Sequence, residues 1–562
     1  MYPTSASERA HGWTVCRLCS SPAKRSLRVT AASTLALALV FGATSAAHAF
    51  ELELKLGLLN RFTMRRNAVE RFLRYSPQAR AYDTDAFVNP RRDDTFYSFV
   101  ANAGVYLGVT RWLGFGFSVD SGELRPNGRL PATTTVTMPD AIAQRYGEPV
   151  VLSTDDQRTT TSNGQSIEAE AKQTVFVRQA FMRLMAPGSE WLSLEVGRRD
   201  LDVAGGLIYD DYGLGASLVL DLQKKWREGA PRVALRAILP TRGYTGGTRS
   251  PLLEGRFGWA FSKLESISLL FSYFHDGDSN FGRMLDPLLS EVAVSSAAAA
   301  DNPTRHAQLF ALSSTVTPST SADVTWLGFA GNKIFGGKLM LSCTALVQLG
   351  QLRLKNPLPE LTQTLARAGV DLGALGTRSE DELLMPTVGF AVDAGARVLL
   401  TENMVIGGWF LYLSGAANPL LQSGDSLDNT TYRGFLSVVP YITRTNIFFS
   451  GGLNQTFTGR RTSSAGLNAR GVLAGGLTWE WGGIKHLELR VGGAALFSDV
   501  ASMSGGRFYG VEIDSEATYA FTKWLGVSVE YDALLPGGFF REQRTIHQLL
   551  VGLDLRFDYH KG

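Results

Sequence analysis

The residues best suited to bind a metal ion lie in the run His275-Asp276-Gly277-Asp278-Ser279-Asn280. A calcium-binding loop begins with carboxylates at its first and third positions and an amide or carboxylate at its fifth, and here these positions hold Asp276, Asp278 and Asn280. The pattern fails beyond that point, because Phe281 stands where such a loop needs glycine and Pro287 where it needs a bidentate glutamate. We interpret the run as a solvated strand end, with a surface calcium site as the alternative.

Catalytic motifs are missing from the rest of the sequence. Tyr209-Asp210-Asp211-Tyr212 holds adjacent carboxylates at a spacing that fixes no reaction, and we interpret it as an extracellular loop that packs into the mouth of a barrel. The histidines at positions 275, 306, 486 and 547 lie near no Gly-x-Ser-x-Gly motif. We expect no enzyme and no cofactor; a barrel hydrolase is the remaining alternative.

The N-terminus carries the pattern of a secretory signal peptide. Lys24, Arg25 and Arg28 precede an apolar run over residues 29–46, and Ala47-His48-Ala49 supplies small residues at a cleavage site. This order predicts a signal peptide over residues 1–49, cleaved near Ala49. An uncleaved membrane helix is the alternative.

Removal of residues 1–49 changes the charge of the chain. The whole sequence has a formal charge of +3, and the leader contains five basic residues and one acidic residue, so a mature chain would carry about −1. Nucleic acid is therefore not an expected partner. The pair Cys16 and Cys19 lies in the leader, which leaves Cys343 alone, so a mature chain has no internal disulfide to stabilise it.

Alternation of apolar and polar residues marks three extended segments near the C-terminus. Glu512, Asp514 and Glu516 alternate with apolar residues after Tyr509. Glu530 and Asp532 do so after Trp524, and the segment from residue 549 to 559 repeats the pattern. A period of two places one set of side chains on each face of a strand, as in a barrel with lipid outside and a polar lumen inside.

Short turns join such segments in pairs, often with an aromatic residue beside the turn. The nine predicted turns lie at residues 109–113, 186–190, 222–232, 260–264, 331–338, 400–404, 443–446, 482–485 and 520–525. Nine turns join eighteen strands, and one further strand at each end gives twenty, with eighteen as the alternative. We expect these turns on the periplasmic side.

The connections between the pairs are long and rich in Ser, Thr, Ala and Pro. The longest cover residues 63–95, 124–172, 277–321, 354–384 and 415–431. Helical spacing occurs in two of them, at Leu358, Leu361, Leu365 and Ala368 and again over residues 284–292. Such a helix could fold into the lumen or cap the outer rim, and the sequence leaves both open.

These patterns together predict an all-β fold for residues 50–562. A soluble β-sandwich would show similar alternation. The leader, the length and the asymmetry between short turns and long connections favour a transmembrane antiparallel up-and-down β-barrel of about 18–20 strands, with short periplasmic turns and long extracellular loops.

Residues 173–222 resemble the alginate-export family of outer-membrane porins. The matching positions are Gly197-Arg198-Arg199, the run Gly205-Gly206-Leu207-Ile208-Tyr209-Asp210-Asp211-Tyr212, and Gly215-Ala216. The family pattern has Gln where this chain has Arg199, and Asp-Gly where it has Gly215-Ala216. The resemblance implies a barrel and a channel function in general terms, and it covers about fifty residues.

Alternation also predicts which charged residues face the lumen. The sign of that charge indicates whether a polyanion such as alginate could pass. The candidate lumen residues near the resembling segment are Glu195, Arg198, Arg199, Arg232, Arg236 and Arg256, and those near the C-terminus are Glu512, Asp514, Glu516, Glu530 and Asp532. Acidic positions outnumber basic ones over the whole lumen, whereas a path for a polyanion needs the reverse. Neutral or cationic solutes fit this lumen better than alginate.

We therefore expect a porin-like channel in the outer membrane of a Gram-negative-type bacterium, for diffusion or export of a hydrophilic solute or polysaccharide. Its expected partners are outer-membrane lipid, the solute and a periplasmic export protein. The alternative is a non-conducting structural barrel that anchors a secretion, export or surface-motility complex, with its charges paired across strands.

Overall fold

The computed structural model describes the strands and the segments next to them. These are residues 51–68, 75–76, 81–82, 92–121, 176–186, 189–222, 229–242, 245–246, 250–262, 265–277, 281, 320–356, 358–367, 382–417, 431–438, 442, 444–449, 470–501, 506–539 and 544–561. The expected signal peptide and the predicted helix at 284–292 lie outside them, as do Asp278 and Asn280.

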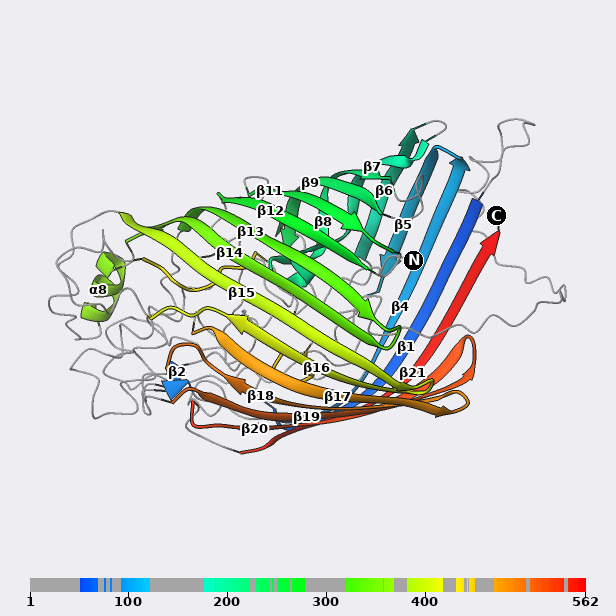
Figure 1. Cartoon of the computed structure of the whole chain (residues 1–562). Helices are drawn as coiled ribbons and strands as arrows, with labels where there is room; N and C mark the ends of the chain where they lie inside the picture. The colour runs from blue at the N-terminus through cyan, green and yellow to red at the C-terminus, as the bar shows by residue number, and fades with distance from the viewer. Residues whose placement is uncertain are drawn as a thin grey trace.

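Antiparallel strands close into one barrel (Figure 1). The sheet has nineteen strands, and leaving out the two-residue β10 gives an eighteen-stranded barrel. Each long strand pairs with the next along the chain, and β1 pairs with both β4 and β21. The long strands are β1 (Glu51–Ala68), β4 (Arg92–Thr110), β5 (Leu113–Asp120), β6 (Phe176–Ala186), β7 (Ser189–Val203), β8 (Tyr209–Asp221), β9 (Ala230–Arg242), β11 (Leu252–Ala260), β12 (Ser266–Asp276), β13 (Thr320–Phe335), β14 (Leu339–Lys355), β15 (Glu382–Thr401), β16 (Met404–Leu413), β17 (Val472–Ile484), β18 (Leu487–Phe497), β19 (Phe508–Thr522), β20 (Leu525–Pro536) and β21 (Ile546–Lys561).

Three short strands lie outside this set. β10 (Thr245–Gly246) pairs with β9, and β2 (Tyr75–Ser76) pairs with β3 (Ala81–Tyr82). The closing register runs from the pair Leu52 and Lys561 to the pair Arg66 and His547. Closure matters because a sheet without a free edge leaves no row of backbone groups unpaired in lipid.

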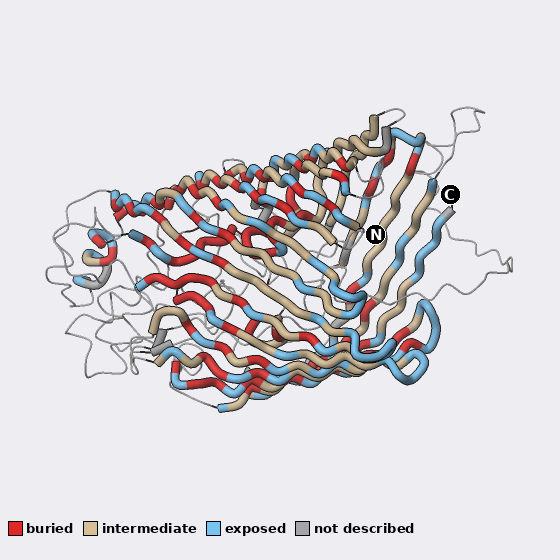
Figure 2. The backbone as a smooth tube through the Cα atoms, viewed as in Figure 1, coloured by how far each residue is buried: buried red, intermediate tan, exposed pale blue. Residues whose placement is uncertain are grey.

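The alternation in the sequence corresponds to two surfaces of different chemistry. Large apolar side chains such as Phe257, Leu269 and Leu477 point outward and are exposed, whereas Glu512 and Glu530 point inward and are buried. Figure 2 shows exposed and buried residues alternating along the strands. An apolar outer surface around a polar interior is the arrangement of a barrel that spans a membrane. No helix among the described residues is long and apolar enough to cross a membrane.

Threonine side chains organise several of the short turns. Thr110 Oγ1 accepts hydrogen bonds from the backbone N–H groups of Trp112 (3.2 Å) and Leu113 (3.0 Å). Thr522 Oγ1 does the same for Trp524 (3.2 Å) and Leu525 (3.1 Å). The hydroxyl satisfies donors that the ladder leaves free, which explains the recurrent Thr in these turns. Of the nine predicted turns, those outside residues 443–446 are confirmed as links between paired strands.

The turn predicted at residues 443–446 is wrong. Residues 431–449 belong to the connection between β16 and β17, and the part of them that the structure describes contains no strand and lies inside the barrel. We call residues 431–449 the inner segment. Its apolar residues alternate because they pack against the barrel interior, not against lipid. The described residues on either side of this turn form no strand of the barrel, so twenty strands is wrong and the alternative of eighteen is right.

The helix predicted from Leu358 is present as α8 (Leu358–Arg367). Asn356 Oδ1 accepts a hydrogen bond from the N–H of Leu358 (3.0 Å), which caps its start. Leu358 and Leu361 are fully buried. Figure 1 places α8 beyond the strand ends, at the end of the barrel opposite the short turns, so this helix caps the rim and does not plug the lumen.

Candidate functional site in the barrel interior

The inner segment crosses the barrel interior and is hydrogen-bonded at both ends and in the middle. Its first residues attach to β15: Tyr432 N–H donates to Pro386 O (2.8 Å), and Val388 N–H donates to Tyr432 O (2.9 Å). Burial raises the pKa of the Tyr432 hydroxyl, and the charge of Arg470 opposes that shift. The phenol therefore stays neutral.

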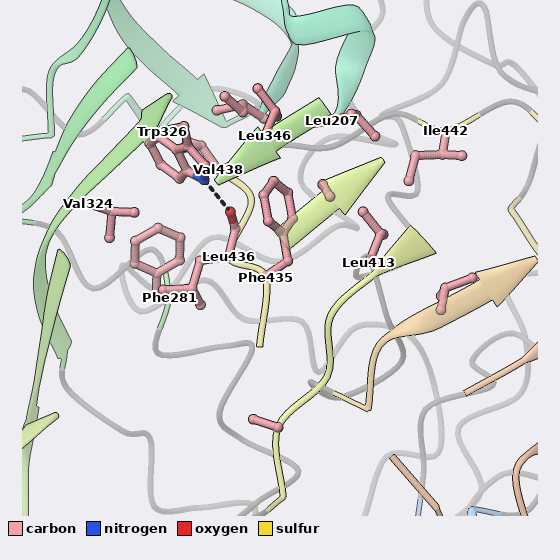
Figure 3. Close-up of a cluster of buried hydrophobic side chains, with 14 of the residues drawn as sticks. Leu207, Phe281, Val324, Trp326, Leu346, Leu413, Phe435, Leu436, Val438 and Ile442 are labelled. Carbon is pink, nitrogen blue, oxygen red and sulfur yellow. Dashed lines mark hydrogen bonds between the residues drawn. The ribbon is translucent and has the colours of Figure 1, made fainter. Parts of the chain in front are cut away.

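Two buried polar side chains of the barrel wall hold the middle of the inner segment. Gln348 accepts a hydrogen bond from Leu436 N–H (2.6 Å) and donates one to Gly434 O (3.4 Å). Trp326 Nε1 donates to Leu436 O (3.2 Å), as Figure 3 shows. Both side chains are fully buried, so these bonds satisfy groups that water does not reach.

The tip of the β7–β8 hairpin meets the inner segment inside the barrel. Ser437 Oγ donates to Leu207 O (2.7 Å), and Val438 N–H donates to Ile208 O (2.9 Å). The tip turns sharply through three consecutive positive φ angles, at Ala204 (57°), Gly205 (67°) and Gly206 (84°). Glycine adopts positive φ angles without strain, which explains why glycine occupies two of these three positions.

Carboxylates of the opposite wall hold the far end of the inner segment. Glu512 accepts hydrogen bonds from the backbone N–H groups of Ile447 and Phe448, the latter at 2.9 Å. Asp532 Oδ1 accepts one from Asn446 Nδ2 (2.9 Å). The inner segment thus runs from β14 and β15 to β19 and β20, across the lumen.

Apolar side chains fill the space around these polar contacts. Leu207, Phe435, Leu436, Val438 and Phe448 belong to one buried cluster with residues of the barrel wall, part of which Figure 3 shows. Inner segment and hairpin tip together narrow the interior, because each occupies space that an empty barrel of this size would leave to water. This is the constriction, and the charged walls beside it define the candidate site.

The wall of β6–β11 is rich in arginine, and four of its arginines form ion pairs with acids. Glu195 forms ion pairs with Arg183 (2.6 Å) and Arg199. Arg236 contacts Glu254 at 2.9 Å, and its Nη1 also donates to the backbone oxygen of Asp202 (2.9 Å). Arg232 lies 3.9 Å from Asp221, and Arg256 lies opposite Ala234 on the same inward face.

The wall of β15–β20 is rich in acidic residues instead. Its inward carboxylates are Asp393, Glu480, Glu488, Glu512, Asp514, Glu516, Glu530 and Asp532, and the guanidinium groups beside them are Arg397, Arg444 and Arg490. Arg397 contacts Glu480, and Arg444 contacts Asp393. Carboxylates outnumber guanidinium groups on this wall, so it attracts cations.

Most of the predicted lumen residues come together on these two walls. Arg198 does not, because it lies opposite Leu214, whose side chain is 48% exposed on the outer surface. Of the predicted loop residues, Tyr209 and Asp210 are fully buried at the start of β8, whereas Asp211 and Tyr212 are half-buried. Tyr212 accepts a hydrogen bond from Arg178 Nη1 (3.0 Å).

Asp276, the first residue of the weak calcium motif, has a structural role. Its Oδ2 accepts hydrogen bonds from Phe281 N–H (3.0 Å) and Thr320 Oγ1 (3.3 Å). Within the described part of the chain, no group of three or more His, Cys, Asp or Glu residues is arranged to hold a metal ion.

Several residues of the site do not follow from alternation in the sequence, among them Arg183, Gln348 and Arg444. Arg183 lies in a segment without clear alternation, yet its position opposite Glu195 follows from the hairpin turn at residues 186–190. Gln348 is a neutral residue in an apolar strand, and nothing local distinguishes it. Arg444 lies where the pattern predicts a turn at residues 443–446, so its interior position does not follow from the sequence.

Neither a scan against protein-family models nor a search of curated proteins gave a match. Among solved structures, the chain is similar to Pseudomonas aeruginosa OpdK with vanillate, at TM-score 0.45 and 9% identity over 90% of this chain and 99% of that one. P. aeruginosa OccK9 (OpdG) matches at TM-score 0.44 and 12% identity, and Acinetobacter baumannii OccAB4 at 0.43 and 10%. Each match covers 90% of this chain and 98% of the other. TM-scores below 0.5 assign no family or substrate to this chain.

Proposed function

We propose that this chain is a porin-like channel of a Gram-negative outer membrane, through which small hydrophilic solutes diffuse, with a preference for cations. The closed barrel and its apolar outer surface support insertion into a membrane. The leader supports export and cleavage near Ala49. The observation that carries the proposal is the acidic wall of β15–β20 beside the constriction, because a charged lumen selects permeant ions by sign.

Recording from the purified protein in planar bilayers tests this function. In a KCl gradient the reversal potential should show potassium more permeant than chloride. Replacing Glu480 and Glu516 with Gln should move the reversal potential toward zero, because it removes two lumen charges. A matched double variant at the outer surface, Val491→Gln with Ile513→Gln, should leave it unchanged. Absence of conductance in the wild type would exclude a channel.

A second function is favoured by the apolar cluster that fills part of the interior. A barrel packed with buried apolar residues could remain closed and anchor a secretion, export or surface-motility complex through its loops and a periplasmic partner. Affinity capture from outer membranes separates the two functions, since a stoichiometric partner without conductance supports the anchor.

The resemblance to alginate-export porins supports the proposed channel but does not support alginate as its solute. The resembling residues form the hairpin tip and part of the arginine-rich wall, which places them beside the constriction. The arginines there are paired with Glu195, Asp221 and Glu254, and the facing wall is acidic. A polyanionic polysaccharide would meet repulsion from that wall. Osmotic swelling with neutral sugars of graded size, compared with uronate oligomers, tests the distinction.

A further inference from the structure

Arg444 of the inner segment occupies a position between an acid and an aromatic ring. Its guanidinium group contacts the carboxylate of Asp393 on β15. The guanidinium carbon also lies 5.8 Å from the centre of the Trp409 ring, whose strand is β16. A carboxylate and the face of an indole are the two partners that hold a planar organic cation most strongly.

A small cavity adjoins this guanidinium group between the inner segment and the wall. Its lining includes Trp409, Arg444, Asn446, Arg490, Asp514 and Glu516. The remaining volume of about 20 Å³ has room for about one water molecule. The side chain of Arg444 therefore fills most of the space that would be open without it.

The cavity lining carries two guanidinium groups, of Arg444 and Arg490, and two carboxyl groups, of Asp514 and Glu516, so that removal of Arg444 leaves one acidic group in excess. Arg490 lies opposite Glu480 and Glu516 on the neighbouring strands, so its charge is already matched. Asp514 Oδ1 is buried and has no hydrogen-bond partner among the residues that the structure describes, whereas the same carboxyl group is hydrogen-bonded to Glu512. A donor arriving in this space would find an acceptor that the protein itself does not use.

We propose that this space beneath the inner segment is a binding site for a small planar organic cation, of the guanidinium type, and that Arg444 is its resident occupant. The inference deepens the proposed channel function and rests on it, since the cation would be a permeating solute. A free cation competes with Arg444 for Trp409 and Asp393. Displacement of Arg444 releases one of the charged contacts that hold the inner segment in the lumen.

Emptying the site gives the direct test. Arg444→Ala leaves a cavity shaped for a guanidinium group, and methylguanidinium added at millimolar concentration should enter it. In the wild type the tethered Arg444 guanidinium group competes for the site at an effective concentration of millimolar or more. Without that competitor, methylguanidinium should block potassium current in R444A at a concentration at least about tenfold lower than in the wild type. Binding should also raise the melting temperature of R444A in detergent micelles, a readout that needs no conductance.

Arg397→Ala is the matched control. It removes from the same wall one guanidinium group, the one that pairs with Glu480. It does not open the cavity beside Trp409. A purely electrostatic effect would appear in both variants, whereas the proposed site predicts block and thermal stabilisation in R444A alone. The double variant R444A/W409L should lose both effects.

Two results would overturn the site. One is equal sensitivity of R444A and R397A to methylguanidinium, and the other is full retention of the effect in R444A/W409L. The proposed function fails separately. If the wild type conducts nothing but R444A is stabilised by methylguanidinium and R397A is not, the site stands and the channel does not.

Discussion

Glu512 is the residue through which the far end of the inner segment can be released. Its carboxylate accepts backbone N–H bonds from Ile447 and Phe448 and is fully buried. A hydrogen bond to a charged group contributes about 1.5–3 kcal/mol. Glu512→Ala removes both bonds and should favour the detached state by about 3 kcal/mol, or roughly 100-fold. Glu512→Gln keeps one acceptor and should favour it by about 1.5 kcal/mol, or roughly tenfold.

Hydrogen–deuterium exchange of the protein in detergent micelles measures this release. The peptide containing residues 446–449 should exchange fastest in E512A, at an intermediate rate in E512Q and slowest in the wild type. In planar bilayers the same variants should show larger or more frequent open-channel steps, because the detached segment no longer narrows the lumen.

Glu488→Gln controls for the loss of charge. Glu488 lies on the same wall, opposite Thr518, and is not one of the side chains that bind the described part of the inner segment. Exchange at residues 446–449 should be unchanged in E488Q. If E512A and E512Q also leave it unchanged, Glu512 does not anchor the inner segment and the reasoning is refuted.

Three further predictions test the walls and the outer surface. Arg236→Ala leaves the Glu254 carboxylate, whose side chain is 1% exposed, without its ion pair. This should cost about 3–5 kcal/mol in urea unfolding from vesicles, and R236A/E254A should recover most of it; no recovery would contradict the pairing. Gln348→Leu leaves Leu436 N–H and Gly434 O without partners, so exchange should rise at residues 434–436 more than at 446–449. Leu477→Arg places a charge where the side chain is 68% exposed on the outer surface. It should cost about 2–4 kcal/mol near the bilayer midplane and lower the folded fraction in vesicles, whereas an unchanged folded fraction would mean that this face does not meet lipid.

The strands were predictable because two independent signals agree on them. Alternation gives each strand its two faces, and turns such as that around Thr522 give the pairing, so that the inward positions of Glu512 and Glu530 followed from the sequence. Arg183 could have been placed in the same way, from its position opposite Glu195 across a turn.

The inner segment was not predictable on the same grounds. An extended chain buried in the lumen and a strand facing lipid both need apolar residues at alternate positions. Phe435 and Val438 satisfy either requirement, and the sequence does not say which surroundings bury them. The distinction depends on distant residues such as Gln348 and Leu207, whose contacts with the inner segment exist only in the folded barrel. The constriction and the place of Arg444 within it therefore needed the structure.

The attachment of the inner segment to both walls sets an order for assembly. Its first contacts, to Pro386 on β15 and Gln348 on β14, involve residues that precede it in the chain. Its last contacts, to Glu512 and Asp532, involve residues that follow it by 64 or more positions. We therefore expect the far end of the inner segment to attach only once β19 and β20 are in place, which makes the final narrowing of the pore a late step in the folding of this barrel.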